Sequence, residues 1–196
     1  MTPLAARFFA RDTKVVARAL VGQVLVSDVG GRRTAGRIVE TEAYVGPHDP
    51  ACHAWGGRRT PRLERLYGPP GTAYIYFTYG MHWCFNAVTE AVDYPAAVLI
   101  RALEPLAGLA VMRRRRRGAA DRLLCAGPAR VCEALGLTGR LDGAVLQRGV
   151  LRILNGNARR DRIVVTPRIG VSRAADWPLR FCLAGSPWLS RPIAAR

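Results

Sequence analysis

The chain has 196 residues, 49% of them hydrophobic, and a formal net charge of +16. This length suits one domain over residues 1–196 with a substantial core, and the hydrophobic fraction argues against a disordered chain. No apolar run reaches membrane-spanning length and no secretory pattern opens the chain. We therefore expect a soluble protein of the bacterial cytoplasm, associated with the nucleoid and with no membrane partner.

The excess of positive charge favours a polyanionic partner, most often nucleic acid, because cationic side chains displace the counterions condensed on such a polymer. Arginine codons favoured by a GC-rich genome are the alternative explanation. Lys14 is the only lysine, so amine nucleophiles are nearly missing. The five cysteines are scattered without a Cys-x-x-Cys pair, which favours reduced and mostly buried thiols.

The first elements in chain order are a helix and two strands. Asp12 is the predicted N-cap of a short helix that ends near Gly22. The residues expected to face inward from this helix are Val15, Val16, Ala19 and Leu20. A strand is predicted over residues 23–27, and Gly30-Gly31 is a predicted turn into a second strand that ends at Tyr44.

The middle of the chain is predicted to be a loop, a hairpin and a strand. Residues 46–70 are rich in Gly, Pro, Arg and His, which indicates a long functional loop between strands of one sheet. Both halves of residues 73–86 alternate around Tyr79-Gly80, which predicts a β-hairpin with Tyr79 near its tip. A further strand is expected over residues 96–100, ending in Arg101.

The last part of the chain favours short helices and strands. Residues 103–112 have helical spacing and run into Arg113–Arg117. Such an arginine run is usually the solvated end of a helix; the alternative is a patch that contacts phosphates. Gly127-Pro128 predicts the start of a helix over 129–135, and strands are expected over 162–166 and 179–183. The predicted fold is α+β: a single domain with a largely antiparallel β-sheet, flanking helices and a protruding β-hairpin.

Two acidic residues of the strand that ends at Tyr44 are the first candidates for chemistry. Alternation places Glu40, Glu42 and Tyr44 on one face. The opposite face receives Val39, Thr41, Ala43 and Val45. Two carboxylates on one face are costly to bury without a partner or a task. They could bind a hard metal such as Mg²⁺ together with Asp49, act as an acid/base pair, or divide into one base and one structural acid paired with an arginine.

No second acidic cluster follows in the sequence, so a single Glu acting on water is the more economical hypothesis. His48, Cys52 and His53 suggest zinc. A structural zinc site, however, needs four ligands, and the other cysteines lack paired spacing. We therefore expect neither a metal nor another cofactor.

Three tyrosines are candidates for a flat binding slot. Taken singly, each of Tyr44, Tyr76 and Tyr79 is better explained as a core aromatic. Tyr44 shares a strand face with Glu42, however, and an aromatic at a hairpin tip is costly unless it contacts something. Aromatics beside a carboxylate would accept a flat ring, and an aromatic at the tip would serve as a wedge between base pairs.

Several long motifs point to one family. They are Gly36-Arg37-Ile38-Val39-Glu40-Thr41-Glu42-Ala43-Tyr44, Tyr76-x-x-Tyr79-Gly80-Met81 with Asn86, Arg101-Ala102-Leu103-Glu104-Pro105, and Gly127-Pro128. In these motifs the chain resembles the alkyladenine (3-methyladenine) DNA glycosylases. The similarity runs from about Lys14 to Ser190 in one order and with little insertion, so it is more specific than any single motif.

The resemblance implies catalytic roles for matching residues. Glu42 stands where the family has the general base for a water that attacks the anomeric carbon of deoxyribose. Arg101 and the carbonyl of Ile169 stand where the family holds this water. Tyr79 matches the tyrosine that fills the gap left in the duplex.

The resemblance also implies how the base and the DNA backbone are held. Tyr44 and Tyr76 match aromatics that stack on the flipped base, His53 lies opposite them, and Asn86 matches a residue that screens exocyclic groups. The positions that match residues near the DNA backbone are Arg58, Thr60, Met81, Arg130 and Gly170. The departures from the family are Leu63 in place of a frequent Asn, Leu66 in place of a common Met, and His82 in place of a frequent aromatic; they bear on backbone contact and lesion preference.

The implied activity is that of a monofunctional DNA repair glycosylase acting as a monomer on double-stranded DNA. It would flip alkylated or deaminated purines out of the duplex and hydrolyse the N-glycosidic bond, leaving an abasic site. The alternative from another class is a basic nucleic-acid-binding module without activity. That alternative leaves Glu40 and Glu42 without a purpose, because acids oppose phosphate binding.

Overall fold

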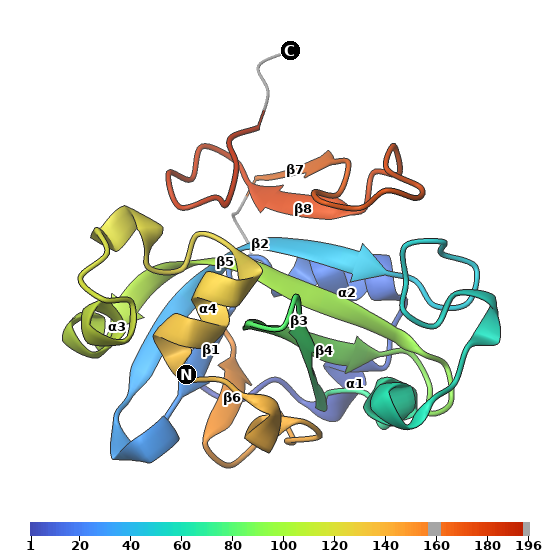
Figure 1. Ribbon diagram of the computed structural model, residues 1–196, viewed down its shortest axis with the longest axis horizontal. Helices are drawn as coiled ribbons and strands as arrows, with labels where there is room; N and C mark the ends of the chain where they lie inside the picture. Colours follow the sequence, from blue (N-terminus) through green and yellow to red (C-terminus); the bar gives the residue numbers. More distant parts are fainter. Residues whose placement is uncertain (157–161, 194–196) are drawn as a thin grey trace.

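The computed structural model describes residues 1–156 and 162–193, whose strands form one eight-stranded antiparallel sheet (Figure 1). The main path of the sheet is β3 (Ala73–Thr78), β4 (His82–Thr89), β5 (Ala96–Ala107), β2 (Thr34–Tyr44), β1 (Val24–Ser27) and β6 (Leu151–Leu154). Beyond this path, β8 (Arg180–Leu183) pairs with β2 and with β7 (Ile163–Thr166). The predicted α+β fold with a largely antiparallel sheet is confirmed.

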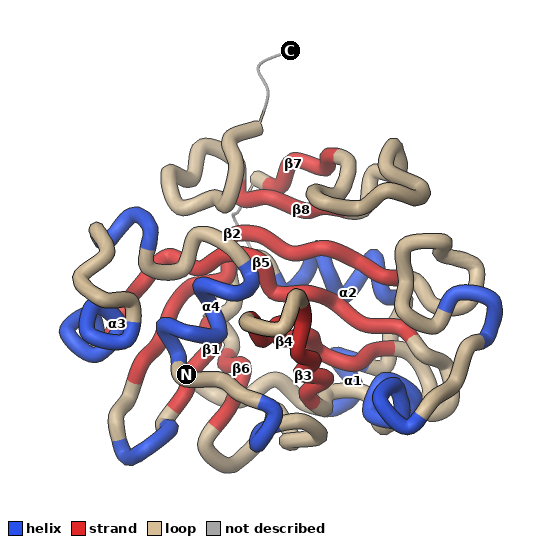
Figure 2. The backbone as a smooth tube through the Cα atoms, in the orientation of Figure 1, coloured by secondary structure: helices blue, strands red, loops and turns tan. Residues whose placement is uncertain are grey.

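Short helices flank this sheet (Figure 2). In the described part of the chain they are α1 (Ala6–Phe9), α2 (Thr13–Leu20), α3 (Leu109–Arg115) and α4 (Pro128–Leu135). The 3₁₀ turns are Val29–Gly31, Trp55–Gly57, Pro61–Tyr67, Asp121–Leu123 and Gly139–Leu141. The longest α-helices have eight residues, and no helix among the described residues combines the length and the apolar character needed to cross a bilayer.

Helix α2 begins where the sequence predicts. The Asp12 side chain accepts hydrogen bonds from two backbone N–H groups of the first turn, at 2.9 and 3.1 Å. Val16 and Leu20 are buried, but Val15 is 49% exposed, so the prediction that Val15 faces inward is wrong. The buried stripe includes Ala17 in its place, because in a short amphipathic helix one narrow face meets the sheet.

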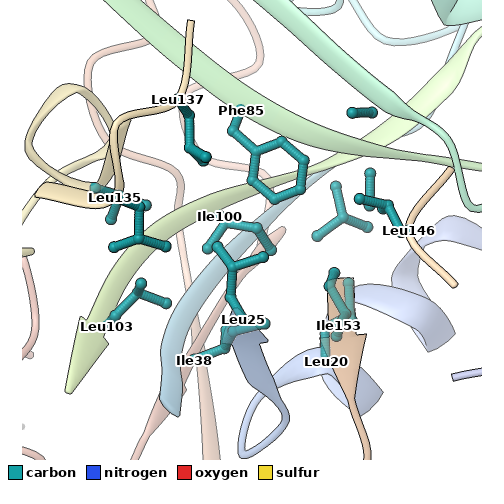
Figure 3. Close-up of a cluster of buried hydrophobic side chains, with 14 of the residues drawn as sticks. Leu20, Leu25, Ile38, Phe85, Ile100, Leu103, Leu135, Leu137, Leu146 and Ile153 are labelled. Carbon is teal, nitrogen blue, oxygen red and sulfur yellow. The ribbon is translucent and has the colours of Figure 1, made fainter. Parts of the chain in front are cut away.

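The hydrophobic core is formed by the sheet together with α2 and α4 (Figure 3). Leu20 of α2 and Leu135 of α4 are fully buried with Ile38 of β2, Phe85 of β4 and Ile100 of β5. Burying a side chain of this size contributes about 1.5–3 kcal/mol. This cluster therefore fixes the positions of β2 and β5, the strands that carry Glu42 and Arg101.

Strand β5 is longer than the sequence predicts. The expected helix over residues 103–112 is wrong, because residues up to Ala107 pair with β2 in the order Leu103 with Ile38 and Pro105 with Gly36. Pro105 is tolerated in this strand, because β4 pairs only with residues 96–99 of β5 and leaves that side of Pro105 without a ladder partner in β4. Helix α3 starts only after Gly108, whose φ is +76° and whose added Cβ would meet the Arg33 carbonyl oxygen at 2.3 Å.

Strand β2 contains a bulge that the simple alternation misses. Its register against β5 shifts on both sides of Glu40. Ala43 belongs to the main core as expected, whereas Val39 packs in a separate cluster with Ala102 and Leu189. The prediction that Val39 shares a face with Ala43 is therefore wrong, although Glu40 and Glu42 do share a partner in Arg101.

The β3–β4 hairpin matches its prediction. Tyr79 and Gly80 form the turn with φ values of 52° and 66°, and two successive positive φ values are the requirement of a type I′ turn. The Tyr79 side chain is 84% exposed, with Phe77 and Met81 partly exposed beside it. The hairpin therefore presents an aromatic residue to solvent at its tip.

The arginine run after α3 is mostly engaged with the protein itself. Arg113 forms two hydrogen bonds of 2.7 Å with Asp121, and Arg116 pairs with Glu133. Arg115 donates to backbone carbonyls at the end of α4 and after β1. These contacts favour the interpretation of a helix end over that of a dedicated phosphate patch.

Candidate active site

A pocket of about 550 Å³ brings most of the predicted site together. It lies between the end of β2, the β3–β4 hairpin, the loop over residues 46–70 and the segment after β7. The predicted site residues that line it are Tyr44, His53, Tyr76, Tyr79, Asn86, Arg101, Ile169 and Gly170. Its size is within the range of ligand-binding clefts.

The other residues expected near the DNA backbone lie outside the lining of this pocket. Arg58 and Thr60 line a second pocket of about 360 Å³ that shares His53 with the first. Met81 lines a third pocket, bounded by the hairpin and α4. Arg130 lies on α4 and donates to a backbone carbonyl one turn earlier, at 3.2 Å. None of these four residues is part of the lining of the main pocket.

Glu42 is completely buried directly behind the pocket lining. Its Oε2 accepts hydrogen bonds from the Tyr44 hydroxyl at 3.0 Å and from Arg101 Nη1 at 3.3 Å. Its Oε1 accepts from the Ile169 N–H at 2.8 Å. All three donors belong to residues that line the pocket, so the carboxylate faces the pocket side of the sheet and not the hydrophobic core.

Arg101 joins this carboxylate to the segment after β7. Its Nη1 donates both to Glu42 and to the Ile169 carbonyl, the latter at 3.4 Å, while its Nε donates to Glu40 at 3.2 Å. A carboxylate, a guanidinium and a carbonyl oxygen therefore meet at one point of the pocket wall. The sequence predicted these three groups together.

Glu40 has a structural environment. It accepts hydrogen bonds from Arg180 Nε at 2.7 Å and from Arg101, and also from the Ser190 N–H at 2.6 Å and hydroxyl at 2.7 Å. The expectation that Glu40 pairs with arginine is confirmed. Its carboxylate links β2 to β5, to β8 and to the chain beyond β8.

Burial raises the pKa of Glu42, because a desolvated carboxylate is less stable than the neutral acid. The charge of Arg101 and the hydrogen bonds from Ile169 and Tyr44 oppose this effect without cancelling it. A carboxyl group beside a pocket with a pKa above its ordinary value is suited to accept a proton near neutral pH.

Aromatic rings form much of the pocket wall. The His53 and Tyr76 rings lie 4.5 Å apart between centroids at an interplanar angle of 75°, and Tyr74 and Tyr76 lie 5.5 Å apart. Tyr44 approaches the pocket from β2 and packs in the same cluster as Tyr74 and Tyr76. A flat ligand entering the pocket would therefore meet ring surfaces from β2, from β3 and from the loop.

Tyr74 is a pocket residue that the sequence analysis did not single out. Its hydroxyl lies 2.9 Å from His53 Nδ1, and its backbone carbonyl accepts a hydrogen bond from Asn86 Nδ2 at 3.1 Å. The alternation along β3 could have identified it, because that alternation puts Tyr74 and Tyr76 on the same face. Burial, together with the charges of Arg62 and Arg58, lowers the pKa of His53 and so favours its neutral form.

The three carboxylates considered for magnesium binding are engaged with protein groups. Glu40 and Glu42 accept from arginines, and Asp49 forms an ion pair with Arg168. Within residues 1–156 and 162–193, no three His, Cys, Asp or Glu side chains come together in a group that could hold a metal ion. The arrangement of donors thus fits proton transfer better than the magnesium or zinc alternatives.

Comparison with known proteins agrees with the geometry. The profile of the methylpurine-DNA glycosylase (MPG) family matches residues 7–187. The chain belongs to this family. The resemblance inferred from the motifs is confirmed, and with it the predicted enzyme class, a glycosylase of DNA.

Relatives cover nearly the whole chain. A protein of Carboxydothermus hydrogenoformans, provisionally named a 3-methyladenine DNA glycosylase, is 46% identical over 94% of this chain and 97% of its own length. A protein of Nitrosospira multiformis with the same provisional name is 49% identical over 94% of this chain and 92% of its own length. The human DNA-3-methyladenine glycosylase is 42% identical over 97% of this chain and 68% of its own length.

Proposed function

We propose that the chain is a monofunctional DNA glycosylase that releases alkylated or deaminated purines from double-stranded DNA. It would act as a monomer, since its single domain carries the whole pocket, and in the cell it would work on the nucleoid. The observation that carries this proposal is the junction of Glu42, Arg101 and the Ile169 carbonyl beside a pocket walled by aromatic rings.

Recognition begins with eversion of the damaged nucleotide. A base inside a duplex is out of reach, and extruding it costs a few kcal/mol, less for a damaged or mispaired base. Tyr44, Tyr76 and His53 would stack on the extruded purine, with each stacked ring worth about 1–3 kcal/mol. An electron-poor alkylated purine gains further through cation–π attraction. Asn86, buried beside Tyr74, would screen the exocyclic groups.

The bond is then broken by water. Within the described residues, Glu42 Oε1 accepts only the Ile169 N–H, so this oxygen keeps acceptor capacity for a water molecule. The water oxygen bonds to the anomeric carbon while the glycosidic C–N bond breaks and its electron pair leaves with the purine. The water proton goes to Glu42, and the Ile169 carbonyl and Arg101 hold the water in place.

A non-catalytic nucleic-acid-binding module would explain the charge and the exposed Tyr79, but not the buried carboxylate with a raised pKa. Incubation with hypoxanthine- or 3-methyladenine-containing duplex DNA, followed by alkali, separates the two functions. Strand breaks that appear only after alkali are expected for the glycosylase. Intact DNA after alkali, at protein concentrations that shift the duplex on a gel, would support the binding module.

The Tyr79→Ala variant is expected to bind duplex DNA with a stable lesion analogue about 5- to 150-fold more weakly. This range corresponds to the loss of one base–aromatic stack of about 1–3 kcal/mol. Tyr79→Phe keeps the ring and is the matched control, which should bind like the wild type. Equal affinities of all three proteins, measured by fluorescence anisotropy, would mean that the hairpin tip is not a wedge.

No covalent protein–DNA adduct is expected after borohydride reduction during turnover. A lyase step needs an amine that forms a Schiff base, and the only lysine, Lys14, lies in α2 and does not line the pocket. Denaturing electrophoresis with labelled DNA is the measurement. A trapped adduct, with a known bifunctional glycosylase as the positive control, would contradict the assignment as monofunctional.

A further inference from the structure

A fully buried ion pair lies behind Tyr44. Arg168 Nη1 and Nη2 lie 2.5 and 2.8 Å from the two carboxylate oxygens of Asp49, and both side chains are 0% exposed. Arg168 Nε has no hydrogen-bond partner among the described residues. Such a pair is costly to desolvate, and apolar replacements often match its stability. Stability alone therefore does not explain why an ion pair is buried at this position.

The ion pair ties together three walls of the pocket. Arg168 Nη1 also donates to the Ala43 carbonyl of β2 at 3.1 Å. Asp49 accepts from the N–H groups of Val45 and Ala51, at 3.2 and 3.0 Å, which fixes the loop that leads to His53. The residue after Arg168 is Ile169, whose N–H and carbonyl contact Glu42 and Arg101.

Arg168 also lies against the ring of Tyr44. Its guanidinium carbon is 4.8 Å from the ring centroid. Because Tyr44 lines the pocket and Arg168 does not, the ring face that Arg168 covers is closed to a ligand. A cation on one face of an aromatic ring weakens the attraction of that ring for a cationic ligand, because both cations interact with the same quadrupole. Asp49 balances the charge of that cation.

We propose that Asp49 and Arg168 are positioning residues that hold Tyr44 and the Ile169 peptide around Glu42. Because the charges of the two side chains cancel, the Tyr44 ring can favour positively charged purines. This inference rests on the proposed base release. The ion pair would then set how strongly the protein prefers cationic lesions such as 7-methylguanine over neutral lesions such as hypoxanthine.

The charge of the pair also acts on Glu42 itself. Arg168 interacts electrostatically with Glu42. The other groups that face Glu42 are Tyr44 and Glu40 of β2, Arg101 of β5, and Cys182 of β8. Arg180, the neighbour of Glu42 in β8, is paired with Glu40. An unpaired Arg168 would add one positive charge to this set and favour the ionised carboxylate.

The Asp49→Asn variant tests both consequences. Asparagine has nearly the same shape but leaves Arg168 charged, since arginine does not lose its proton in proteins. The ratio of single-turnover release rates, 7-methylguanine over hypoxanthine, is expected to fall about 2- to 30-fold, the range of one cation–π interaction. The acid limb of the pH–rate profile is expected to move to lower pH. In the double variant Asp49→Asn/Arg168→Met, the ratio of release rates and the position of the acid limb should return to their wild-type values, or shift past them in the opposite direction.

Asp121→Asn, which frees Arg113 on the surface, makes the same charge change away from the pocket and is the control. A fall of both release rates by one factor, with an unmoved acid limb and no recovery in the double variant, is what a positioning role alone would give, and it would overturn the inference that the neutrality of the pair sets the preference for charged purines. Should Asp49→Asn fail to fold, Arg168→Met decides, because a raised ratio supports the inference and an unchanged or lower ratio contradicts it. A wild type that releases neither base would instead refute the proposed function.

Discussion

Replacing Glu42 with glutamine is expected to slow base release by about 10²- to 10⁴-fold, the usual contribution of a general base. Glutamine preserves the shape of the side chain, and its single amide oxygen can still accept the Ile169 N–H while its NH2 group faces the Tyr44 hydroxyl oxygen, so the pocket should keep its form. It cannot take the proton of the attacking water. Affinity for DNA containing a lesion should therefore stay within a few-fold of the wild type.

Glu40→Gln is the matched control, because Glu40 has the same burial on the same strand and shares Arg101 with Glu42, but its other partners, Arg180 and Ser190, do not line the pocket. This variant should lower the free energy of unfolding and retain most of the release rate per folded molecule. Single-turnover kinetics and urea denaturation of both variants give the comparison. A Glu42→Gln protein that releases hypoxanthine at the wild-type rate would exclude Glu42 as the base.

Replacing Arg101 with methionine is the second change with a large expected effect. Removing one partner of a buried ion pair costs about 3–5 kcal/mol of stability. Glu40 would keep Arg180, whereas Glu42 would lose the cation that most strongly opposes its desolvation. The pKa of Glu42 should then rise further, so the acid limb of the pH–rate profile should move to higher pH, and release at pH 7 should fall.

Arg101→Lys separates charge from geometry. It keeps the cation near Glu42 but not the forked contacts to Glu40, Glu42 and the Ile169 carbonyl. Its acid limb should stay close to that of the wild type, while its rate falls because the water is held less well. An acid limb that stays in place in Arg101→Met would mean that Arg101 does not control the ionisation of Glu42.

Local patterns in the sequence sufficed for several elements. Asp12 caps α2 because capping is a local interaction. Tyr79-Gly80 marks the hairpin turn because its backbone geometry restricts the residues that fit. The helix expected over residues 103–112 failed for the opposite reason: pairing with β2, a distant strand, overrode a helical spacing.

The site was predictable to the extent that it resides in motifs. Glu42, Arg101 and Ile169 meet as expected, because the family resemblance supplied contacts that no local pattern contains. Asp49 and Arg168 are 119 positions apart, and Arg168 was not among the candidate residues of the sequence, so their ion pair became visible only in the fold. Asp49 was a candidate metal ligand because its partner Arg168 could not be recognised from the sequence.

We propose that one carboxyl group, that of Glu42, converts water into a nucleophile against an everted purine. The pH dependence of single-turnover hypoxanthine release, compared between wild type and Glu42→Gln, tests it most directly. A group that must be ionised gives a rate that rises with pH through its pKa, and here burial raises that pKa, so the acid limb should lie above the range of an ordinary glutamate. The limb should vanish in Glu42→Gln. A limb that persists unchanged in that variant would exclude Glu42 as the group that must be ionised.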